Sequence, residues 1–574
     1  MKKIINAPED FVADTLDGIY YAHPDEVTYV DGSKKAMVKR HLRQGKVGIA
    51  TGGGSGHLPL FLGYIGEGML DGCSVGEVFQ SSSAKDMLSV TRAIDTGAGV
   101  LYLYGNYGGD KMNFAMAAEQ AGFEDNIRVC RVIGRDDVAV ERQENRRGIA
   151  GIFFVYKCAG AAAEEMMDLD ECYRIAQKAA ANVRTMGVSL SSCTLPRVGH
   201  PSFEIAEDEM EIGMGIHGEP GVRRGKIQTA AEIADELLER ILPELELAEG
   251  DEVAVLLNGL GGTPLEEQYI VGKRVHEAMD ARGVNVFHTY VGEFATAMEM
   301  AGLSISVLKL DDELKGLLAK PANALCFKQF QLDANRAYER VDLDQAPAQA
   351  DEAPAADVEA APKSCDEALD SADFVRLFGA WRDMIEENKE YLVKLDSVGG
   401  DGDLGLAMSD GFNAAMATLD GRTFNDVGEV LYSAGKTISE TASSSLGTLV
   451  AFGFIGAGKA VKGKSEIMPI ELGTVLSAFE EAIMHLGGAK VGDKTFLDGF
   501  DPAVQVVRAA KTDEEVPEAL RKAAVAAKEG SDGTTKLLAK FGRIAVRGEE
   551  SRSILDPGSV LAALLVDTLA KTFA

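Results

Sequence analysis

Three aspartates lie close together in the stretch Leu395–Gly405, separated mainly by glycine: Asp396, Asp401 and Asp403. No lysine or arginine lies among them. Two carboxylate charges about 4 Å apart repel by roughly 4 kcal/mol where the effective dielectric is near 20. A bound cation relieves this repulsion, and oxygen ligands without cysteine or histidine favour Mg²⁺ or Ca²⁺ over zinc. A solvated acidic turn that caps a helix is the other interpretation of the same residues.

The residues after this stretch restrict the kind of cation site. An EF-hand loop counted from Asp401 would need glycine and glutamate where the chain has Leu406 and Phe412. Leu406 to Leu419 predicts a helix instead, which puts the carboxylates near a helix N-terminus that also favours phosphate. Gly453 to Ala460 resembles a P-loop but ends in alanine. If this region binds a nucleotide, we expect a carboxylate-held metal rather than a P-loop to hold it.

Length, charge and cysteine content limit the class of protein. The chain has 574 residues, which predicts two to four domains. Its net charge of −32 argues against binding to nucleic acid or to an anionic membrane. The seven cysteines are scattered and form no Cys-x-x-Cys pair, which is typical of a reducing cytoplasm. No apolar run predicts a signal peptide or a membrane span, so we expect a cytoplasmic, multidomain enzyme or binding protein.

A short strand in the first half of the chain runs into a glycine-rich segment. Val47 to Thr51 is the predicted strand, and Gly52 to His57 follows it. The carboxyl ends of strands in open α/β sheets are where ligands bind. The segment fits neither the dinucleotide-binding fingerprint nor the P-loop. His57 is therefore either a ligand-facing residue or a capping or core histidine.

The same pattern of strand and glycine turn occurs again. Gly99 to Tyr104 predicts a strand, and a helix is expected from about Lys111, so that Asp110 is either a functional carboxylate or simply its N-cap. Alternating strands, turns and helices predict an α/β fold with a largely parallel sheet. Near residue 190 the chain passes into a second α/β subdomain, in which Glu211 to Gly221 places four glycines around His217. Such glycine density lets the backbone approach a small ligand.

The last third of the chain has a different composition. Residues 341–364 are rich in alanine, proline and acid, which predicts an extended linker. Helical patterns follow from Asp366 to Phe573 almost without strand signals, including one at Thr534 to Phe541. The predicted domains are residues 1–340, with subdomains of about 1–190 and 191–340, then the linker, then an all-α domain at 365–574.

Taken together, these segments resemble the dihydroxyacetone kinase family. The first half resembles its substrate-binding K-type domain, and the last third its nucleotide-binding L-type domain, an all-helical barrel. The resemblance covers nearly the whole chain except the linker. It rests on these motifs in order: TGGGSGHLP (51–59), GNYGGDKMNF (105–114), VIGRDDVAV (132–140), GVSLSSCTLP (187–196), EIGMGIHGEPG (211–221), LDSVGGDGDLG (395–405), GDKTFLD (492–498), GR (542–543) and DPG (556–558).

The resemblance implies roles in the K-type domain. His217 matches the histidine that binds the ketone carbonyl covalently as a hemiaminal. Asp110 matches the residue that accepts the proton of the attacking hydroxyl, and His57 matches its partner, which orients the substrate. The glycine-rich segment implies substrate-binding positions at Gly53, Gly54, Ser55 and Gly56.

The resemblance also implies ATP and Mg²⁺ as cofactors. Asp396, Asp401 and Asp403 match the Mg²⁺ ligands, which hold the phosphates of ATP. The positions expected to contact the nucleotide are Leu404, Ser444, Ser445, Gly492, Arg543, Asp556 and Gly558. Because both domains are fused in one chain, ATP rather than a phosphoenolpyruvate-linked system is the expected donor. A homodimer formed through the K-type domains is the expected assembly.

The chain departs from the family pattern close to the substrate. Gly105 and Gly108 stand where the family usually has lysine and threonine, which alters polarity and is expected to add room. Leu58 and Leu404 replace a glutamate and a histidine, and Ser443–Ser445 replaces a glycine pair. The prediction is ATP-dependent phosphorylation of a terminal hydroxyl of dihydroxyacetone or of a four-carbon ketose such as erythrulose. The alternatives are an inactive regulatory protein on the same scaffold and a lyase that forms cyclic FMN from FAD.

Overall fold

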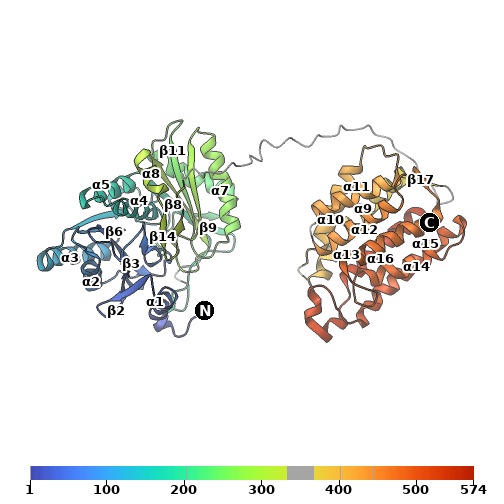
Figure 1. The fold of residues 1–574 in the computed structure, drawn as a ribbon, viewed down its shortest axis with the longest axis horizontal. Coiled ribbons are helices and arrows are strands. Elements are labelled where there is room, and N and C mark those ends of the chain that lie inside the picture. The colour runs from blue at the N-terminus through green and yellow to red at the C-terminus, as the bar shows by residue number, and fades with distance from the viewer. Residues whose placement is uncertain (1, 202, 333–367, 401, 443) are drawn as a thin grey trace. The chain divides into compact units, whose positions relative to one another are not determined.

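The protein consists of two compact units, Met1–Arg340 and Val341–Ala574. The computed structural model describes residues 2–201, 203–332, 368–400, 402–442 and 444–574, and the predicted linker at 341–364 lies outside them. Figure 1 shows an α/β first unit and a helical second unit. The fold class expected from the sequence, an α/β part followed by an all-helical part, is confirmed.

A mixed six-stranded sheet forms the base of the first unit. Its central and far strands are parallel, β5 to β3, β3 to β6 and β6 to β7, whereas β1 and β2 add an antiparallel edge. In spatial order the strands are β1 (Val27–Val30), β2 (Ser33–Lys39), β5 (Gly72–Val78), β3 (Gly48–Ser55), β6 (Val100–Gly105) and β7 (Val129–Gly134).

Gly52 to Gly54 lie inside β3 rather than in a loop after it, contrary to the sequence expectation. The strand runs so close to its neighbours that a side chain would not fit. A Cβ on Gly52 would lie 2.4 Å from the carbonyl oxygen of Ser74 on β5. The glycines therefore extend the sheet up to the site instead of forming a flexible turn.

Helices cover both faces of this first sheet (Figure 1). One face packs against α2 (Ala84–Ile94) and α3 (Gly108–Asp125), and the other against α4 (Ile152–Glu164) and α5 (Leu169–Ala181). All residues of α4 except Glu164 are buried. A helix that is apolar all round belongs inside a core, and α4 shares its apolar cluster with residues of both large sheets. The remaining helix before the sheet is α1 (Phe11–Ala22).

The second large sheet is mostly antiparallel, which corrects the expectation of largely parallel pairing. Only β11 and β12 are parallel, and β13 enters between β8 and β11 in the opposite direction. Its order is β10 (Arg223–Lys226), β9 (Glu209–Ile212), β8 (Val183–Ser189), β13 (Gly302–Leu310), β11 (Glu252–Gly259) and β12 (Asn285–Gly292). Its strands thus begin before residue 190.

The helices of the second sheet lie along its outer face and at its end. Alternate residues of β11, Val253, Val255 and Leu257, face a cluster that also holds buried residues of α6 and α7, while Ala254 and Leu256 face the cluster around α4. The unit is completed by α6 (Ala230–Ile241), α7 (Leu265–Asp280), α8 (Asp312–Ala319) and a small sheet of β15 (Lys328–Gln329), β14 (Ala322–Ala324) and β4 (Gly66–Glu67).

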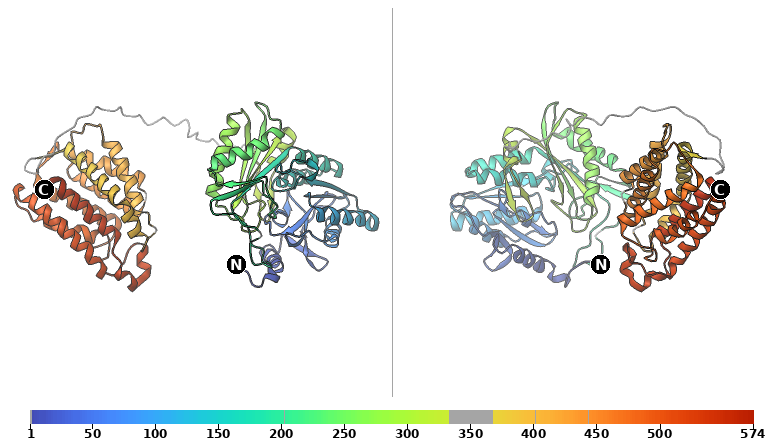
Figure 2. Two further views of the ribbon diagram at one scale, coloured as in Figure 1. Left: turned by 180° about the vertical axis from the view of Figure 1, so that it is seen from behind. Right: turned by 45° about the vertical axis from the view of Figure 1, so that its right-hand side comes forward.

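The helices of the second unit form a closed ring. Each packs against the next along the chain, and the last, α16, returns to the first, α9. Figure 2 shows the same helices lying alongside one another from two further directions. They are α9 (Ser371–Asp396), α10 (Leu404–Leu419), α11 (Val427–Thr441), α12 (Ser445–Ala460), α13 (Leu472–Gly487), α14 (Phe496–Arg508), α15 (Val516–Gly533) and α16 (Pro557–Phe573). A short strand pair, β16 (Leu369–Asp370) with β17 (Glu466–Ile467), accompanies them.

The interior of the ring is apolar and aromatic. The rings of Phe378, Trp381, Phe412 and Phe454 pack against one another there. The stretch Arg547–Phe573, which contains α16, is long and apolar enough to cross a membrane, and 56% of its most apolar window is buried inside the protein. α16 packs against α9, α14 and α15 as part of this core.

The helix predicted at Thr534 to Phe541 is wrong. Only a short 3₁₀ turn, Thr534–Lys536, is present there. The carbonyl groups of Thr534 and Leu537 accept hydrogen bonds from the buried ammonium group of Lys494. A carbonyl turned towards that ammonium group is not aligned with a helix axis, and the chain continues as the irregular segment that contains the 3₁₀ stretch Arg543–Ser553.

Candidate active site

The first candidate site lies where three segments of the first unit meet. β3 leads through Gly56 to His57, β6 ends just before the first turn of α3, which carries Asp110, and the segment after β9 carries His217. β3 and β6 are parallel neighbours, so their carboxyl ends lie at the same edge of the sheet. The sequence prediction of a ligand-binding edge concerns this place.

His57 is buried and held by the second subdomain. Its Nδ1 lies 2.7 Å from the carbonyl oxygen of Thr296. A carbonyl only accepts, so Nδ1 carries the proton and Nε2 has the free lone pair. Burial, together with the charge of the nearby His217, lowers the pKa of His57 to about 3. His57 is thus a neutral hydrogen-bond acceptor, and its Nε2 is buried without a hydrogen-bond partner among the described residues.

His217 stands in a cage of aromatic rings. Its ring meets those of His57 and Tyr107 edge-on, each with centroids 4.8 Å apart, and that of Phe79 at 5.2 Å. On its other side Nδ1 lies 3.0 Å from a carboxylate oxygen of Glu219. The ring is partly exposed, which leaves it accessible to a small molecule.

Asp110 is a functional candidate rather than a cap. The N-cap of α3 is Tyr107, and Asp110 lies in the first helical turn. Burial raises the pKa of Asp110 to about 6, although a hydrogen bond from Ser81 and the charge of His217 oppose the rise. Among the described residues its buried Oδ1 has no partner. A carboxylate with a pKa near neutrality is well suited to take up a proton.

A small cavity brings two of these groups together. Asp110 and His217 both line it, and Gly54 and Tyr107 contribute to the same wall; the other lining residues are Leu60, Phe61, Gly105, Gly148, Ile152 and Ile216. The absence of side chains at the glycines lets backbone atoms form part of the wall. The sequence-predicted pair therefore shares one enclosed space.

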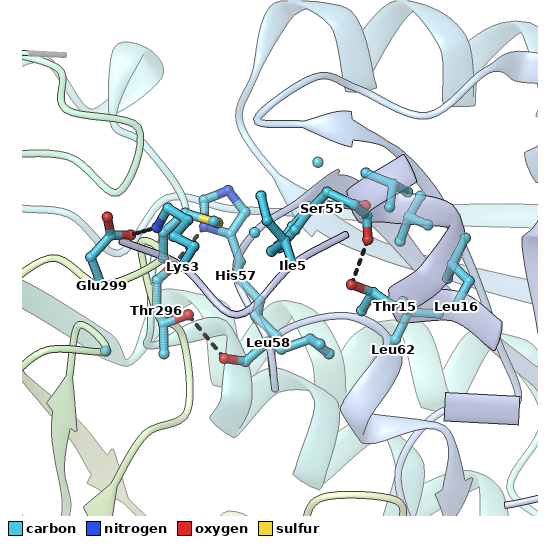
Figure 3. A pocket seen from close by; sticks show the side chains of 18 of the residues that line it. Lys3, Ile5, Thr15, Leu16, Ser55, His57, Leu58, Leu62, Thr296 and Glu299 are labelled. Carbon is cyan, nitrogen blue, oxygen red and sulfur yellow. Dashed lines mark hydrogen bonds and ion pairs between the residues drawn. The ribbon is translucent and has the colours of Figure 1, made fainter. Parts of the chain in front are cut away.

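A larger cavity of about 480 Å³ lies beside His57 (Figure 3). The two cavities share Gly54 and Leu60, and His57 lines only the larger one. Apolar side chains of α1 and of the N-terminal segment form one part of its wall, and Lys3 and Glu299, which form an ion pair, line it as well. Ser55 and Gly56 line this cavity as well, whereas Gly53 packs against the ring of Phe61.

The two glycines that replace family side chains differ in their surroundings. A Cβ on Gly105 would lie 2.8 Å from the ring of Tyr107, so this position offers no added room. The expectation of extra space is wrong there because Tyr107 fills it. At Gly108, by contrast, nothing lies within 4 Å of the place that a Cβ would take. Gly108 is exposed and lines neither cavity, so this departure opens the surface of the protein and not the cavity.

The second candidate site lies in the helical unit, where helix N-termini converge. A Cβ on Gly558, at the start of α16, would lie 3.3 Å from both a side-chain carbon of Leu446 in α12 and the amide nitrogen of Phe496 in α14. The starts of three helices thus meet at one point. Helix N-termini favour anions because their amide groups point outward and their dipoles are positive there. This arrangement fits phosphate groups.

The predicted metal ligands lie at the junction of α9 and α10. Asp396 is the last residue of α9, and Asp403 is the N-cap of α10 without a side-chain capping bond. Asp401 lies outside the described residues, and among those described no group of three potential metal ligands comes together. The donors present are carboxylates, which fits a hard cation such as Mg²⁺.

The remaining predicted nucleotide positions surround these helix starts. Asp556 caps α16, accepting a hydrogen bond from the amide of Ser559 at 2.6 Å. Burial raises the pKa of Asp556 to about 7, and the negative charges of Asp498 and Asp396 add to the rise. These three carboxylates are therefore close enough to repel. Leu404 is the first residue of α10, Ser444 is the N-cap of α12, and Ser445 is the first residue of α12. The amide of Gly492 donates a hydrogen bond to the carboxylate of Asp498, and Arg543 is the first residue of a 3₁₀ segment.

Comparison with known proteins gives the family. Residues 17–326 match the model of the Dak1 domain, and residues 398–571 match that of the DAK2 domain. This chain belongs to the fused dihydroxyacetone kinase family. The kinase is 38% identical to the D-erythrulose kinase of Mycolicibacterium smegmatis, over 99% of this chain and 98% of that protein. It is 34% identical to the L-erythrulose 1-kinase of the same organism, over 100% of this chain and 99% of that protein.

A solved structure supports the same assignment. The dihydroxyacetone kinase of C. freundii, in complex with AMP-PNP and Mg²⁺, superposes with a TM-score of 0.62 at 27% identity and covers 99% of each chain. The match extends over both units of the kinase, the α/β one and the helical one.

Several groups of the kinase's sites were not nominated from the sequence. Glu219 stands two residues after His217, and that spacing could have suggested a partner for the ring. Thr296 lies 239 positions from His57, and nothing in a single sequence links the two. Lys494 and Asp498 sit in the GDKTFLD motif, where only Gly492 was nominated. These omissions involve residues that act through another residue.

Proposed function

We propose that the kinase transfers the terminal phosphoryl group of ATP, with Mg²⁺, to a terminal hydroxyl of a short-chain hydroxyketone. The observation that carries the proposal is the shared cavity of His217 and Asp110, a nucleophilic ring and a carboxylate with a pKa of about 6. The family assignment and the kinases among its relatives supply the reaction class.

His217 holds the substrate as a hemiaminal in this proposal. The ring nitrogen adds to the ketone carbon, the carbonyl π electrons move to oxygen, and that oxygen takes a proton. Such a bond selects carbonyl compounds over plain polyols, because a polyol offers no electrophilic carbon. Tyr107 and Phe79, edge-on to the ring, limit the directions from which a carbonyl can approach.

Asp110 is the general base in this proposal. It takes the proton from the terminal hydroxyl as the hydroxyl oxygen attacks the terminal phosphorus, and ADP leaves. His57 accepts a hydrogen bond from the substrate through Nε2 and thereby orients it. Its neutral state, with a pKa of about 3, suits an acceptor rather than a proton store.

The phosphoryl donor binds in the helical unit. Asp396, Asp401 and Asp403 are the proposed ligands of Mg²⁺, which, when bound, neutralises charge on the phosphate groups. The proposed nucleotide contacts are Leu404, Ser444, Ser445, Gly492, Arg543, Asp556 and Gly558. Support comes from the convergence of helix N-termini at Gly558 and from the AMP-PNP and Mg²⁺ complex of the C. freundii relative.

A four-carbon ketose is the proposed acceptor. Relatives named for D- and L-erythrulose match over the whole chain. We further propose a cytoplasmic homodimer formed through the first unit, on the basis of the family resemblance; the described cysteines form no disulfide, which fits the cytoplasm.

A ketose panel tests the proposal. The full-length protein is assayed with Mg-ATP and D-erythrulose, L-erythrulose or dihydroxyacetone, with ADP release as the readout. We expect one erythrulose enantiomer to have the highest kcat/KM. In the His217→Ala variant we expect kcat/KM to be at least about a hundredfold lower. A clear preference for dihydroxyacetone overturns the four-carbon assignment. Full activity of His217→Ala would contradict the proposed hemiaminal bond between His217 and the ketone.

A further inference from the structure

The loop that carries His217 is held by a chain of charged groups on the side away from the cavity. Glu219 makes two contacts with His217. Its carboxylate accepts a hydrogen bond from the backbone amide of His217 at 3.0 Å, and it also lies 3.0 Å from Nδ1 of the ring. Arg147 reaches the same loop, donating to the carbonyl oxygen of Gly213 at 2.8 Å. Its other bond goes to the buried carboxylate of Asp137 at 2.7 Å.

Glu219 and Arg147 meet at Gly215. A Cβ there would lie 2.1 Å from Oε2 of Glu219 and 2.5 Å from an amino nitrogen of Arg147. Only glycine fits between the two charged groups. The amide of Gly215 also donates to the backbone carbonyl of Glu219 at 3.0 Å, and this turn brings the carboxylate within hydrogen-bonding distance of Nδ1 of His217.

Glu219 is ionised in this setting. Burial opposes ionisation, but the hydrogen bond and charge of His217 and the charge of Arg147 lower its pKa to about 2. An ionised carboxylate only accepts hydrogen bonds. The proton between the two side chains therefore belongs to Nδ1 of His217, and the lone pair of the neutral ring lies on Nε2.

We propose that Glu219 and Arg147 are positioning residues that fix His217 in the Nδ1-protonated tautomer, so that Nε2 is the nitrogen that attacks the ketone. This deepens the proposed function and rests on it. Glu219 sets the tautomer and faces the positive charge that the ring gains when the Nε2–carbon bond forms. That charge disappears when the Nδ1 proton passes to the former carbonyl oxygen, giving a neutral hemiaminal. Arg147 adds its positive charge to the surroundings of Glu219 and anchors the loop to Asp137.

The first test reads the tautomer directly. The chain has 8 histidines, so the ring nitrogens of ¹⁵N-histidine-labelled protein can be assigned, with His217→Gln identifying the signals of His217. Without substrate at pH 7.5 we expect a protonated Nδ1 and a bare Nε2. In Glu219→Gln the amide can donate as well as accept, so both tautomers are expected. A proton on Nε2 in the unaltered protein, or a single unchanged tautomer in Glu219→Gln, overturns the proposal.

The second test separates positioning from folding. Glu219→Gln is expected to lower kcat/KM for the ketose about 10²- to 10⁴-fold, as for other histidines released from their tautomer, with KM for ATP unchanged. Arg147→Gln is expected to lower kcat/KM about tenfold or more, and Arg147→Lys, which keeps the charge but not the fork of donors that reaches Asp137 and Gly213, to restore part of it. Arg223→Gln, which removes an exposed ion pair with Glu236, is the control and is expected to change nothing. Equal losses in Arg147→Lys and Arg147→Gln overturn the role of charge.

The two proposals fail in different ways. If no ketose is phosphorylated but the tautomer is as expected, the substrate assignment falls and the positioning role of Glu219 stands. If His217→Ala abolishes ketose phosphorylation while Glu219→Gln keeps both its tautomer and its rate, the function stands and the positioning role falls.

Discussion

The imidazole rings of His57 and His217 meet edge to face, with centroids 4.8 Å apart and planes at 80°. They come from different subdomains, and each carries its proton on Nδ1, one because of a backbone carbonyl and the other because of a carboxylate. In the proposed function their free Nε2 atoms have different tasks, acceptance of a hydrogen bond by His57 and attack on the ketone carbon by His217. Two chemically identical side chains thus acquire separate roles from their partners.

Removal of the His57 ring should lower the rate without changing its pH dependence. Because the pKa of His57 is about 3, the ring is neutral from pH 5 to 9 and contributes no titration there. We expect His57→Ala to lower kcat about a hundredfold for the preferred ketose, with a pH profile parallel to that of the unaltered protein. The exposed His41→Gln is the control. A lost or shifted limb of the profile above pH 5 would show that His57 exchanges protons.

Asp110 should give the rate its acidic limb. A base works when deprotonated, so kcat is expected to rise with pH through about 6, the pKa to which burial raises Asp110. Asp110→Asn should lower kcat about 10²- to 10⁴-fold, and its pH profile should lack the acidic limb. Steady-state rates from pH 5 to 9 check this, with the exposed Glu119→Gln on the same helix as control. A limb that persists in Asp110→Asn assigns the titration to another group.

The raised pKa of Asp110 also predicts that this residue costs stability. A carboxyl whose folded pKa lies above its unfolded value binds protons better when folded, so its contribution is most favourable at low pH and is lost as pH rises through about 6. Because a tenfold change in proton affinity corresponds to about 1.4 kcal/mol, the cost at pH 8 is on the order of 3 kcal/mol. Asp110→Asn should therefore unfold at higher urea than the unaltered protein at pH 8 and lose this advantage at pH 4. An inactive but more stable variant is the outcome expected of a strained functional group.

Removal of Mg²⁺ or of its ligands should weaken nucleotide binding in the helical unit. Asp396 and Asp403 are the described carboxylates at the junction of α9 and α10. We expect Asp396→Asn and Asp403→Asn each to weaken Mg-ATP binding at least about tenfold in calorimetric titrations, and a chelator to have the same effect on the unaltered protein. The exposed Asp410→Asn on α10 should bind normally. Normal Mg-ATP affinity in both ligand variants would place the metal elsewhere.

Lys494 should be required for the segment that carries Arg543. Its buried ammonium group donates to the carbonyl oxygens of Thr534, Leu537, Ser551 and Ile554, at both ends of that segment. Lys494→Met leaves these acceptors unpaired, and we expect a loss of at least about 3 kcal/mol in the free energy of unfolding and a raised KM for ATP. Trp381 is the only tryptophan of the chain and lies in the core of the helical unit, so its fluorescence in urea reports on this unit alone.

The matched comparison for Lys494 is Lys522→Met. Lys522 lies on the surface of α15 with 66% of its side chain exposed, paired only with Glu518 among the interactions described. It should leave both the urea midpoint and the KM for ATP unchanged. Equal midpoints for the two variants would contradict a structural role of the buried ammonium group.

Much of the architecture followed from local patterns, because local patterns are what a sequence displays. The apolar periodicity predicted the helical unit, and glycine turns after short strands predicted the α/β unit. The direction of the strands in the second sheet was missed because β13 reaches its place between β8 and β11 only through tertiary pairing. The segment at Thr534 has a helical pattern, but the ammonium group of Lys494, forty positions earlier, takes its carbonyls.

For the site as for the fold, residues within motifs could be predicted from the sequence, and contacts between distant residues could not. His217, Asp110 and His57 lie in motifs, so their place at one edge of the sheet could be expected, and two of them share a cavity. Tyr107 lies in the same motif as Asp110, yet only the structure shows its ring filling the space at Gly105. The charge of Arg147 acts on Glu219 from seventy-two positions away, and an interaction over such a distance leaves no trace in a single sequence.

The bond between His57 and Thr296 also determines when the acceptor site comes into being. It closes a loop of 239 residues, and contacts between such distant positions are slow to form because the chain must lose much entropy before they are made. A newly made chain therefore acquires its reactive histidine pair only after both large sheets have folded and docked. In the proposed mechanism, binding of a ketone by the histidine pair therefore begins only once both sheets have docked.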